Sequence, residues 1–344
     1  MSSKLGTPAN TAAWLTASKA HPLEVKSAPY TPPRDNEIVV KNGAVAINPV
    51  DWMVQDQDTS VMLTWLKYPF ILGTDVAGEV VEIGSRVTRF QIGDRVVGHA
   101  VGQDENHNSA AEGAFQTYTV LQSHMASPIP STLSYESACV LPLGVSTADC
   151  GLFPPKNQLA LQYPSVTPKP TSKTLLTWGG STSVGSNAIR LAVAAGYEVI
   201  TTASPRNFDY VKKLGASQVF NYNSKTVVDD LIHAFKGKIT AGALSIGRGA
   251  AEACLNILDK CRGDKFIAMA SYPMPQTPPK HFAVLSTAFN FVSWSISTWF
   301  KTKARGTRYK FIFGTTLVNN GVFVCVRFQS NVCKDEVCKL NLGV

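Results

Sequence analysis

The spacing of hydrophobic and polar positions divides the chain into two parts. Up to about residue 125, short runs rich in β-branched residues alternate with Gly, Pro and Asn, a pattern typical of a small, irregular β-barrel. These runs are EIVVKNGAVAINPVDW (37–52), DVAGEVVEIG (75–84), DRVVGHAV (94–101) and AFQTYTV (114–120).

After a connector with five prolines between Pro154 and Pro170, strand-like runs alternate with helix-like ones. This alternation predicts a parallel sheet covered by helices on both faces, a doubly wound α/β fold whose ligands bind at the carboxyl ends of the strands. The expected strands are 174–178, 197–203, 217–222, 243–247 and 265–270, and the expected helices are 186–196, 208–215, 227–235 and 250–261.

Composition and charge fit a globular protein with anionic partners. The 344 residues are enough for about two domains, and 44% of them are hydrophobic while 16% are charged. The net charge of +8 favours phosphorylated cofactors, acyl-carrier groups or nucleic acid as partners. Basic residues form no long run interleaved with aromatics, so nucleic acid is the least favoured of the three.

Cysteine usage and the N-terminus predict a cytoplasmic protein. The seven cysteines are scattered and include no CxxC pair, which fits reduced thiols and argues against a structural zinc lobe. The N-terminus also has no apolar core of signal-peptide length.

One segment has the length of a membrane span. Residues 282–300 carry no charge and are followed by Lys301, Lys303 and Arg305, as at the end of a spanning helix. Asn290 and six Ser or Thr residues interrupt the segment. We therefore favour no membrane insertion and instead expect a buried helix that lines an apolar pocket.

A Gly- and Ser-rich turn follows the first strand of the predicted sheet. In WGGSTSVG (178–185) the glycines allow a tight turn, and the next helix offers its N-terminus to a pyrophosphate. The match to GxGxxG is imperfect, so a turn without a ligand stays open, whereas the spacing fits neither a P-loop nor a hydrolase nucleophile elbow. The candidate cofactor residues here are Gly180, Ser181, Thr182, Ser183, Val184 and Gly185.

The end of the second strand indicates which dinucleotide binds. NAD sites place an acid about 20 residues beyond the glycines, but the corresponding place here, Thr202 to Asn207, has none, and the next acid is Asp209. Ser204 and Asn207 can hydrogen-bond a 2′-phosphate, and Arg206 can pair with it. The alternative is that these residues only form a turn and helix cap. Both can hold together, and we predict NADPH as the cofactor.

Five short motifs carry a resemblance to a known enzyme family. They are AINPVDW (46–52), GTDVAG (73–78), GDRV (93–96), STSV (181–184) and SPRN (204–207). With them, the chain resembles zinc-independent members of the medium-chain dehydrogenase/reductase superfamily. It is most similar to quinone-oxidoreductase-like proteins and to the fungal trans-acting enoyl reductases of polyketide synthesis. The resemblance implies a GroES-like catalytic domain (1–145), a Rossmann cofactor domain (146–320) and an atypical tail (321–344).

The resemblance also implies that no zinc takes part. Zinc members carry a Cys shortly before the position of Asp51 and a His-Glu pair at the place of Thr74 and Asp75. The six histidines here show no paired ligand spacing. Without a Lewis acid to stabilise an alkoxide, reduction of a polarised C=C is the easier chemistry.

Further site residues follow from the same resemblance. Asn48 and Asp51 border the cofactor, and Asn48 is a candidate donor to a substrate carbonyl or the nicotinamide ribose. The alternatives are a turn at Asn48 and a helix cap at Asp51. Thr147 lies near the nicotinamide, Tyr222 packs by the adenosine, and 246–247 touch the nicotinamide end. The residues implied at these places are catalytic Asn48, Asp51 and Thr147, cofactor-binding Tyr222, Ile246 and Gly247, and substrate-binding Val140, Leu141, Leu143, Gly144 and Thr147.

The expected function is the NADPH-dependent reduction of an enoyl thioester or enone, with quinone reduction as the alternative. A small-molecule or acyl-thioester substrate is implied, an acidic acyl-carrier protein is a candidate partner, and monomer and homodimer stay open. The motif match ends at Asn320, and we interpret 321–344 as translated intron or frameshifted sequence. The alternative to an enzyme is therefore a protein that binds the nucleotide but does not catalyse a reaction.

Overall fold

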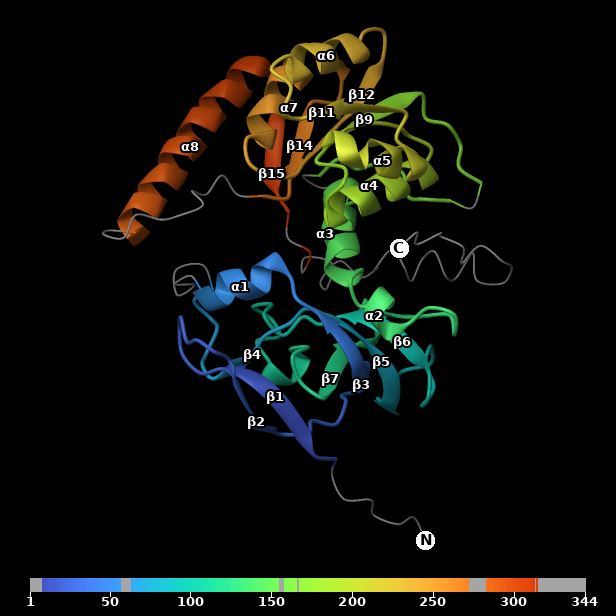
Figure 1. The fold of residues 1–344 in the computed structure, drawn as a ribbon, viewed down its shortest axis with the longest axis vertical. Coiled ribbons are helices and arrows are strands. Elements are labelled where there is room, and N and C mark those ends of the chain that lie inside the picture. The colour runs from blue at the N-terminus through green and yellow to red at the C-terminus, as the bar shows by residue number, and fades with distance from the viewer. Residues whose placement is uncertain are drawn as a thin grey trace. The chain divides into compact units, whose positions relative to one another are not determined.

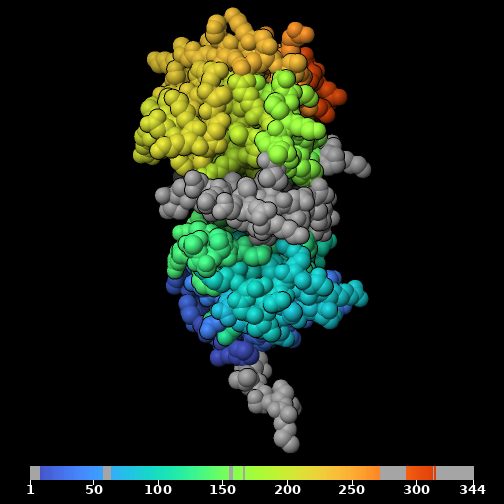
Figure 2. Space-filling view, turned by 90° about the vertical axis from the view of Figure 1, so that its right-hand side faces the viewer, coloured from blue at the N-terminus to red at the C-terminus, as the bar shows by residue number. Residues whose placement is uncertain are grey.

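The computed structural model describes residues 8–56, 63–154, 158–165, 167–271, 283–312 and 314, with only the backbone described for 283–291. The described residues form two compact units, one up to Ser146 and the other from Thr147 to residue 314. Figures 1 and 2 show the elements and the packed surface of each unit.

The first unit is a β-rich domain, as the alternating runs predict. Its five-stranded antiparallel sheet has the order β7-β3-β5-β6-β8, and a three-stranded sheet has the order β2-β1-β4. The helix α3 (Pro142–Leu152) contains the boundary between the units. The other elements are β1 (Asn10–Leu15), β2 (Glu24–Ala28), β3 (Glu37–Ala46), α1 (Pro49–Asp56), β4 (Phe70–Ile71), β5 (Asp75–Ile83), β6 (Arg95–His99), β7 (Tyr118–Gln122), β8 (Ala126–Pro128) and α2 (Tyr135–Ala138), with 3-10 turns at Ala110–Glu112 and Ser123–Met125.

Alternation along the strands builds the core of this unit. Ile38 and Val40 in β3, and Val76 and Val80 in β5, are fully buried and pack together with Val96 of β6. Side chains two residues apart point to the same face of a strand, which is why these positions share one core. The pairing of β5 with β6 places Asp75 directly opposite His99.

The second unit is a doubly wound parallel domain, which confirms the predicted fold class. Its sheet has the order β11-β10-β9-β12-β14-β15, with β13 paired to β12, and the recorded pairings are all parallel. The elements are β9 (Lys173–Trp178), α4 (Ser183–Ala194), β10 (Glu198–Ala203), a 3-10 turn (Pro205–Asn207), α5 (Phe208–Lys213), β11 (Gln218–Asn221), α6 (Val227–Ala234), β12 (Ile239–Ser245), α7 (Ala250–Asp259), β13 (Arg262–Gly263), β14 (Phe266–Met269), α8 (Ala283–Arg305) and β15 (Arg308–Phe311).

Burial on both faces explains the sequence of these strands. Leu175 and Leu176 are neighbours in β9 and therefore point to opposite faces, yet both are fully buried. One face packs under α6 and α7 through residues such as Leu231 and Ile257. Central parallel strands consequently read as continuous apolar runs, as the TLLTW segment does.

The helix α8 differs from the buried, pocket-lining helix expected from its sequence. In the ribbon it lies along the outer flank of the second unit (Figure 1). Its outer side carries Val292, Ile296, Trp299 and Phe300, each between 52% and 62% exposed. The expectation of a buried helix is therefore wrong for these four apolar residues, which lie on the exposed side of α8, whereas Trp294 packs toward the sheet.

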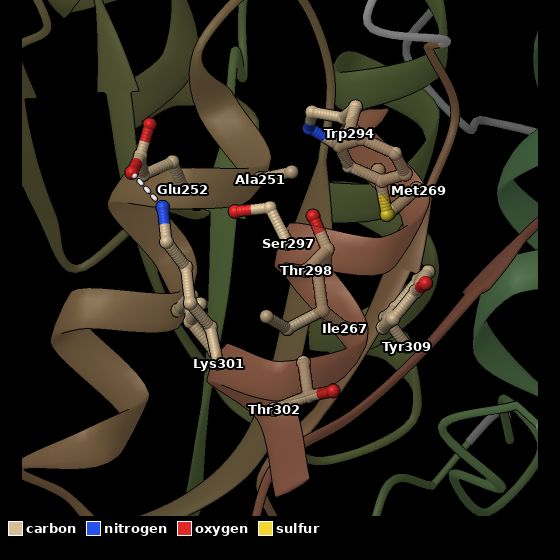
Figure 3. A pocket seen from close by; sticks show the side chains of 11 residues that line it. Ala251, Glu252, Ile267, Met269, Trp294, Ser297, Thr298, Lys301, Thr302 and Tyr309 are labelled. Carbon is tan, nitrogen blue, oxygen red and sulfur yellow. Dashed lines mark hydrogen bonds and ion pairs between the residues drawn. The ribbon is translucent and has the colours of Figure 1, made fainter. Parts of the chain in front are cut away.

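The inner side of α8 borders a small cavity of about 60 Å³ (Figure 3). Trp294 packs edge-on against Tyr309 with ring centroids 5.8 Å apart, and Lys301 forms an ion pair with Glu252 of α7 at 2.8 Å. Hydroxyl groups of Ser297 and other α8 residues also line this space, so the cavity is part polar. No helix within the described residues combines the length and hydropathy needed to cross a bilayer. The tail 321–344 lies outside the described residues.

Candidate functional site

The candidate cofactor site lies where the parallel strands of the second unit end. The turn after β9 begins with Gly179, whose φ of +89° lies in the left-handed region that favours glycine. A Cβ on Gly180 would overlap the hydroxyl of Thr201 in β10, and one on Gly185 would overlap the carbonyl oxygen of Gly179. Gly180 and Gly185 are therefore required by the close packing of the turn against β10 and within itself, and a strand, tight glycine turn and helix in this order fit a dinucleotide.

Thr182 caps the helix that follows this turn. Its Oγ1 accepts a hydrogen bond from the N–H of Gly185 at 3.0 Å and donates one to the carbonyl of Gly179 at 2.8 Å. Ser183 and Val184 form the first turn of α4, where backbone N–H groups lack helical partners and attract anions. Of the sequence candidates, Gly180 to Gly185 thus lie together in one turn.

We expect Thr182→Ala to destabilise the cofactor-free protein by about 1 kcal/mol, because an N-cap hydroxyl is lost. Ser183→Ala is the matched control, since the neighbouring exposed hydroxyl does not cap the helix, and its effect should stay within about 0.5 kcal/mol. Urea unfolding of both variants measures the difference. Equal losses in the two variants would contradict the role of Thr182 as the cap.

The SPRN segment forms a 3-10 turn at the end of β10. Ser204 Oγ accepts a hydrogen bond from Asn207 Nδ2 at 3.2 Å, so these two side chains are already oriented toward one another. Arg206 lies between them in sequence and is exposed. The structure therefore shows the turn that leads into α5, although neither Ser204 nor Asn207 makes a side-chain cap hydrogen bond, and binding of a 2′-phosphate stays a prediction.

The remaining cofactor candidates follow the neighbouring strands. Tyr222 comes directly after β11 and is 45% exposed. Ile246 and Gly247 follow β12, and the N–H of Gly247 donates to Ser271 Oγ at 3.0 Å. Gly247 has a φ of +97° and open space where a Cβ would stand. These residues share the strand-end edge with the glycine turn, as the sequence predicts.

In the first unit, Asn48 and Asp51 lie at the start of α1. Asp51 Oδ2 accepts a hydrogen bond from the backbone N–H of Asn48 at 2.7 Å, as the N3 residue of a capping box does. Its Oδ1 accepts a hydrogen bond from the backbone N–H of Gly73 at 3.2 Å. Asn48 directs its amide to Thr74 Oγ1 at 3.1 Å. Burial raises the pKa of Asp51 to about 6, although both N–H donors favour its ionised form. Asp51 is therefore a cap that orients the Asn48 turn.

Asp75 is a second buried carboxyl next to this turn. It is fully buried, and burial raises its pKa to about 7 against the opposing effect of nearby hydrogen-bond donors. Its Oδ1 accepts from the N–H of Leu143, at the start of α3, at 2.9 Å. Its Oδ2 has no hydrogen-bond partner among the described residues.

His99 and Ser146 continue the polar cluster. The Nδ1 of His99 lies 2.7 Å from Ser146 Oγ, and both residues are fully buried. Burial lowers the pKa of His99 to about 4, so its imidazole is neutral at neutral pH. The sequence did not single out Asp75, His99 or Ser146 as site residues, although Asp75 lies in the GTDVAG motif and His99 in the β-rich run 94–101.

The substrate candidates surround this cluster. Leu141, Leu143 and Gly144 are partly or fully buried around the start of α3, and Thr147 is 9% exposed on the same helix. Val140 is 54% exposed immediately before it. Within the part of the chain that the structure describes, no group of three or more His, Cys, Asp or Glu side chains is placed to hold a metal ion.

Family models match both units. The alcohol dehydrogenase GroES-like domain matches residues 34–131, and the zinc-binding dehydrogenase domain matches residues 183–291. The chain is 59% identical to dehydrogenase pigH of Monascus ruber, over 92% of this chain and 85% of that protein. It is 36% identical to trans-enoyl reductase tndF of Aspergillus flavipes, over 79% of this chain and 77% of that protein.

Solved structures share the fold at lower identity. The CurK enoyl reductase superposes with a TM-score of 0.68 and 16% identity, covering 94% of this chain and 87% of that one. The glycine turn at the strand edge, the domain models and the full-length relatives agree with one another. The chain belongs to the medium-chain dehydrogenase/reductase superfamily, whose oxidoreductases use a nicotinamide cofactor.

Proposed function

We propose that the protein is a zinc-independent, NADPH-dependent reductase of an activated C=C in an enone or enoyl thioester. The observation that carries the choice of NADPH is the end of β10, where an exposed arginine lies in sequence between two polar side chains and no acid lies between Ala203 and Asp209. Relatives named trans-enoyl reductase, such as tndF, support the choice of substrate class. We propose residues 1–145 as the catalytic domain and 146–320 as the cofactor domain.

The cofactor would be held by two turns of the second unit. The N–H groups of 180–185 bind the pyrophosphate, and Ser204, Arg206 and Asn207 bind the 2′-phosphate. Tyr222 flanks the adenosine, and the 246–247 turn supports the nicotinamide end. When bound, NADPH supplies a hydride to the β-carbon of the substrate.

Residues of the first unit would bind the substrate and stabilise the enolate that forms on it. Hydride addition at the β-carbon leaves an enolate on the substrate, and a hydrogen-bond donor on its oxygen lowers the barrier. A proton from a tyrosine or from water then adds to the α-carbon and completes the reduction. Asn48 is the donor we propose, held in place by its backbone bond to Asp51 and its amide contact with Thr74. Both oxygens of Asp51 accept backbone N–H groups, so it orients Asn48 and does not act as the acid.

The net charge bears on how a thioester substrate would arrive. A chain of net charge +8 attracts anionic carriers, so coenzyme A or an acidic acyl-carrier protein is the delivery form that we propose. Thr147 and the 140–144 segment would contact the acyl group.

The decisive experiment is NADPH oxidation by folded protein against a panel of enoyl thioesters, enones and quinones. We expect turnover with a thioester or an enone and slower turnover with quinones. Faster turnover with quinones would make the protein a quinone reductase. Tight NADPH binding without turnover of any member would instead support a nucleotide-binding protein.

We also expect activity to be independent of zinc. Thr74 and Asp75 stand where zinc members carry a His-Glu pair, and a carboxylate with a hydroxyl neighbour is a poor substitute for thiolate and imidazole ligands. Elemental analysis should find no stoichiometric zinc, and a chelator should leave the rate unchanged. One zinc per chain, removed together with activity, would contradict this prediction.

A further inference from the structure

Two buried side chains at the ends of neighbouring strands of the first unit contact the start of α3. Asp75 begins β5 and His99 ends β6, and the two residues are paired across the antiparallel ladder. Paired residues of adjacent strands project from the same face of the sheet. Asp75 accepts the N–H of Leu143 at 2.9 Å, and His99 contacts Ser146 Oγ at 2.7 Å.

The two contacts reach the same side of α3. Leu143 and Ser146 are three residues apart, which places them next to each other on the helix surface. We call the four residues Asp75, His99, Leu143 and Ser146 the strand–helix clamp. Because hydrogen bonds are directional, the clamp fixes the rotation and the height of α3 over the sheet, which apolar packing alone would fix less sharply.

Burying the polar side chains of the clamp costs free energy that apolar side chains at the same places would not cost. Asp75 Oδ2 and His99 Nε2 are both buried and lack hydrogen-bond partners among the described residues. A leucine or a phenylalanine would avoid these two unsatisfied atoms, but it would leave the Leu143 N–H or the Ser146 hydroxyl without its partner. The polar pair therefore contributes a restraint on position rather than burial energy.

We infer that Asp75 and His99 are positioning residues that fix the start of α3, and with it the substrate-contacting segment 140–147. This inference rests on the proposed function for the role of that segment. The same acid lies next to the Asn48 turn, because Asn48 donates to Thr74, which immediately precedes Asp75. One carboxyl thus adjoins both parts of the first unit that the proposed reaction uses.

A nucleophilic role for the same residues does not fit the geometry. Serine, histidine and aspartate together suggest a hydrolytic triad, in which one ring nitrogen meets the serine and the other meets the acid. Here Ser146 is fully buried, so no substrate reaches its hydroxyl. His99 meets Ser146 through Nδ1, while its Nε2 has no hydrogen-bond partner among the described residues.

The test compares Asp75→Leu, which removes the acceptor, with Asp75→Asn, which keeps an oxygen for the Leu143 N–H. We expect Asp75→Leu to raise the KM of the best panel substrate about tenfold and to leave the Kd for NADPH within about twofold. Asp75→Asn should restore most of the lost affinity at pH 6. Unchanged KM in folded Asp75→Leu, or equal loss in both variants, would overturn the inference.

Hydrogen exchange supplies a second measurement that needs no activity. Amides of 140–147 should exchange at least tenfold faster in Ser146→Ala, a milder change that also breaks the clamp, while amides of β9 and α4 keep their rates. Unchanged exchange in 140–147 would overturn the clamp. If the exchange result holds but no panel member is reduced, the proposed function fails and the clamp stands.

Discussion

Arg206→Ala should weaken NADPH binding by about 1.5–3 kcal/mol, or roughly 10- to 150-fold, because it removes a charge-assisted pair with the 2′-phosphate. NADH has a hydroxyl in place of that phosphate and should keep its affinity. The guanidinium is exposed on the turn after β10, so its removal leaves the core intact. Fluorescence titration with both dinucleotides measures the two affinities.

Lys213→Ala is the matched control for this experiment. Lys213 is also exposed and cationic, and it lies one helix turn or more beyond the 204–207 segment in α5. A general electrostatic effect would lower NADPH affinity in both variants, whereas a specific contact lowers it only in Arg206→Ala. Equal losses for NADPH and NADH, or a native preference for NADH, would contradict the assignment of the 2′-phosphate site.

The second unit could be predicted from sequence because its strands are buried on both faces. The segments TLLTW and YEVITTA are continuous apolar or β-branched runs, and the Gly-rich turn between them marks the start of α4. The predicted limits of these elements differ from the observed ones by only a few residues. Local sequence was sufficient here, since each strand and helix carries its own pattern.

The first unit shows where local patterns fall short. Residues 37–52 read as one β-rich run, but β3 ends at Ala46 and α1 begins at Pro49. Proline favours the first position of a helix, so a signal was present, yet the following apolar residues also fit a strand. Which side of α8 faces the sheet likewise depends on tertiary packing. The sequence predicted a buried helix, but Val292, Ile296, Trp299 and Phe300 are exposed.

The clamp could not be predicted because it depends on strand register. Asp75 and His99 are 24 residues apart, and only the pairing of β5 with β6 brings them onto one face. A register shifted by one residue would turn either side chain to the other face of the sheet. In sequence, Asp75 lies 68 residues from Leu143 and His99 lies 47 residues from Ser146. Helix and strand periodicity predict no contacts over such separations.

Asp75→Asn should change the pH dependence of stability. The carboxyl titrates near 3.8 in the unfolded chain and near pH 7 in the folded one, so the folded protein holds one more proton between these values. The contribution of Asp75 to the free energy of unfolding is therefore full below pH 4 and falls as pH rises toward 7. The slope is about 1.4 kcal/mol per pH unit, and the loss reaches at most about 4 kcal/mol.

Asp51 and His99 also titrate in this range, so the difference between variant and wild type is the quantity to measure. Asp51 has a raised pKa and acts in the same sense. Burial, and then the charge of Asp75, raises the pKa of Cys139, so this thiol stays protonated across the range. His99 acts in the opposite sense, because its lowered pKa makes stability fall as pH drops from 6.5 through 4. Asn48 and Thr74 are neutral throughout.

Relative to wild type, Asp75→Asn should gain about 3 kcal/mol in unfolding free energy between pH 4.5 and pH 7.5, since an amide cannot ionise. At the acidic end the variant should be the less stable protein, because its amide N–H replaces the unpartnered Oδ2 in a dry site.

His99→Phe should show the opposite trend, losing stability relative to wild type as pH rises from 4 to 6.5. Urea unfolding across this pH range measures both differences. A difference that stays constant with pH in either variant would show that the residue does not titrate in the buried cluster.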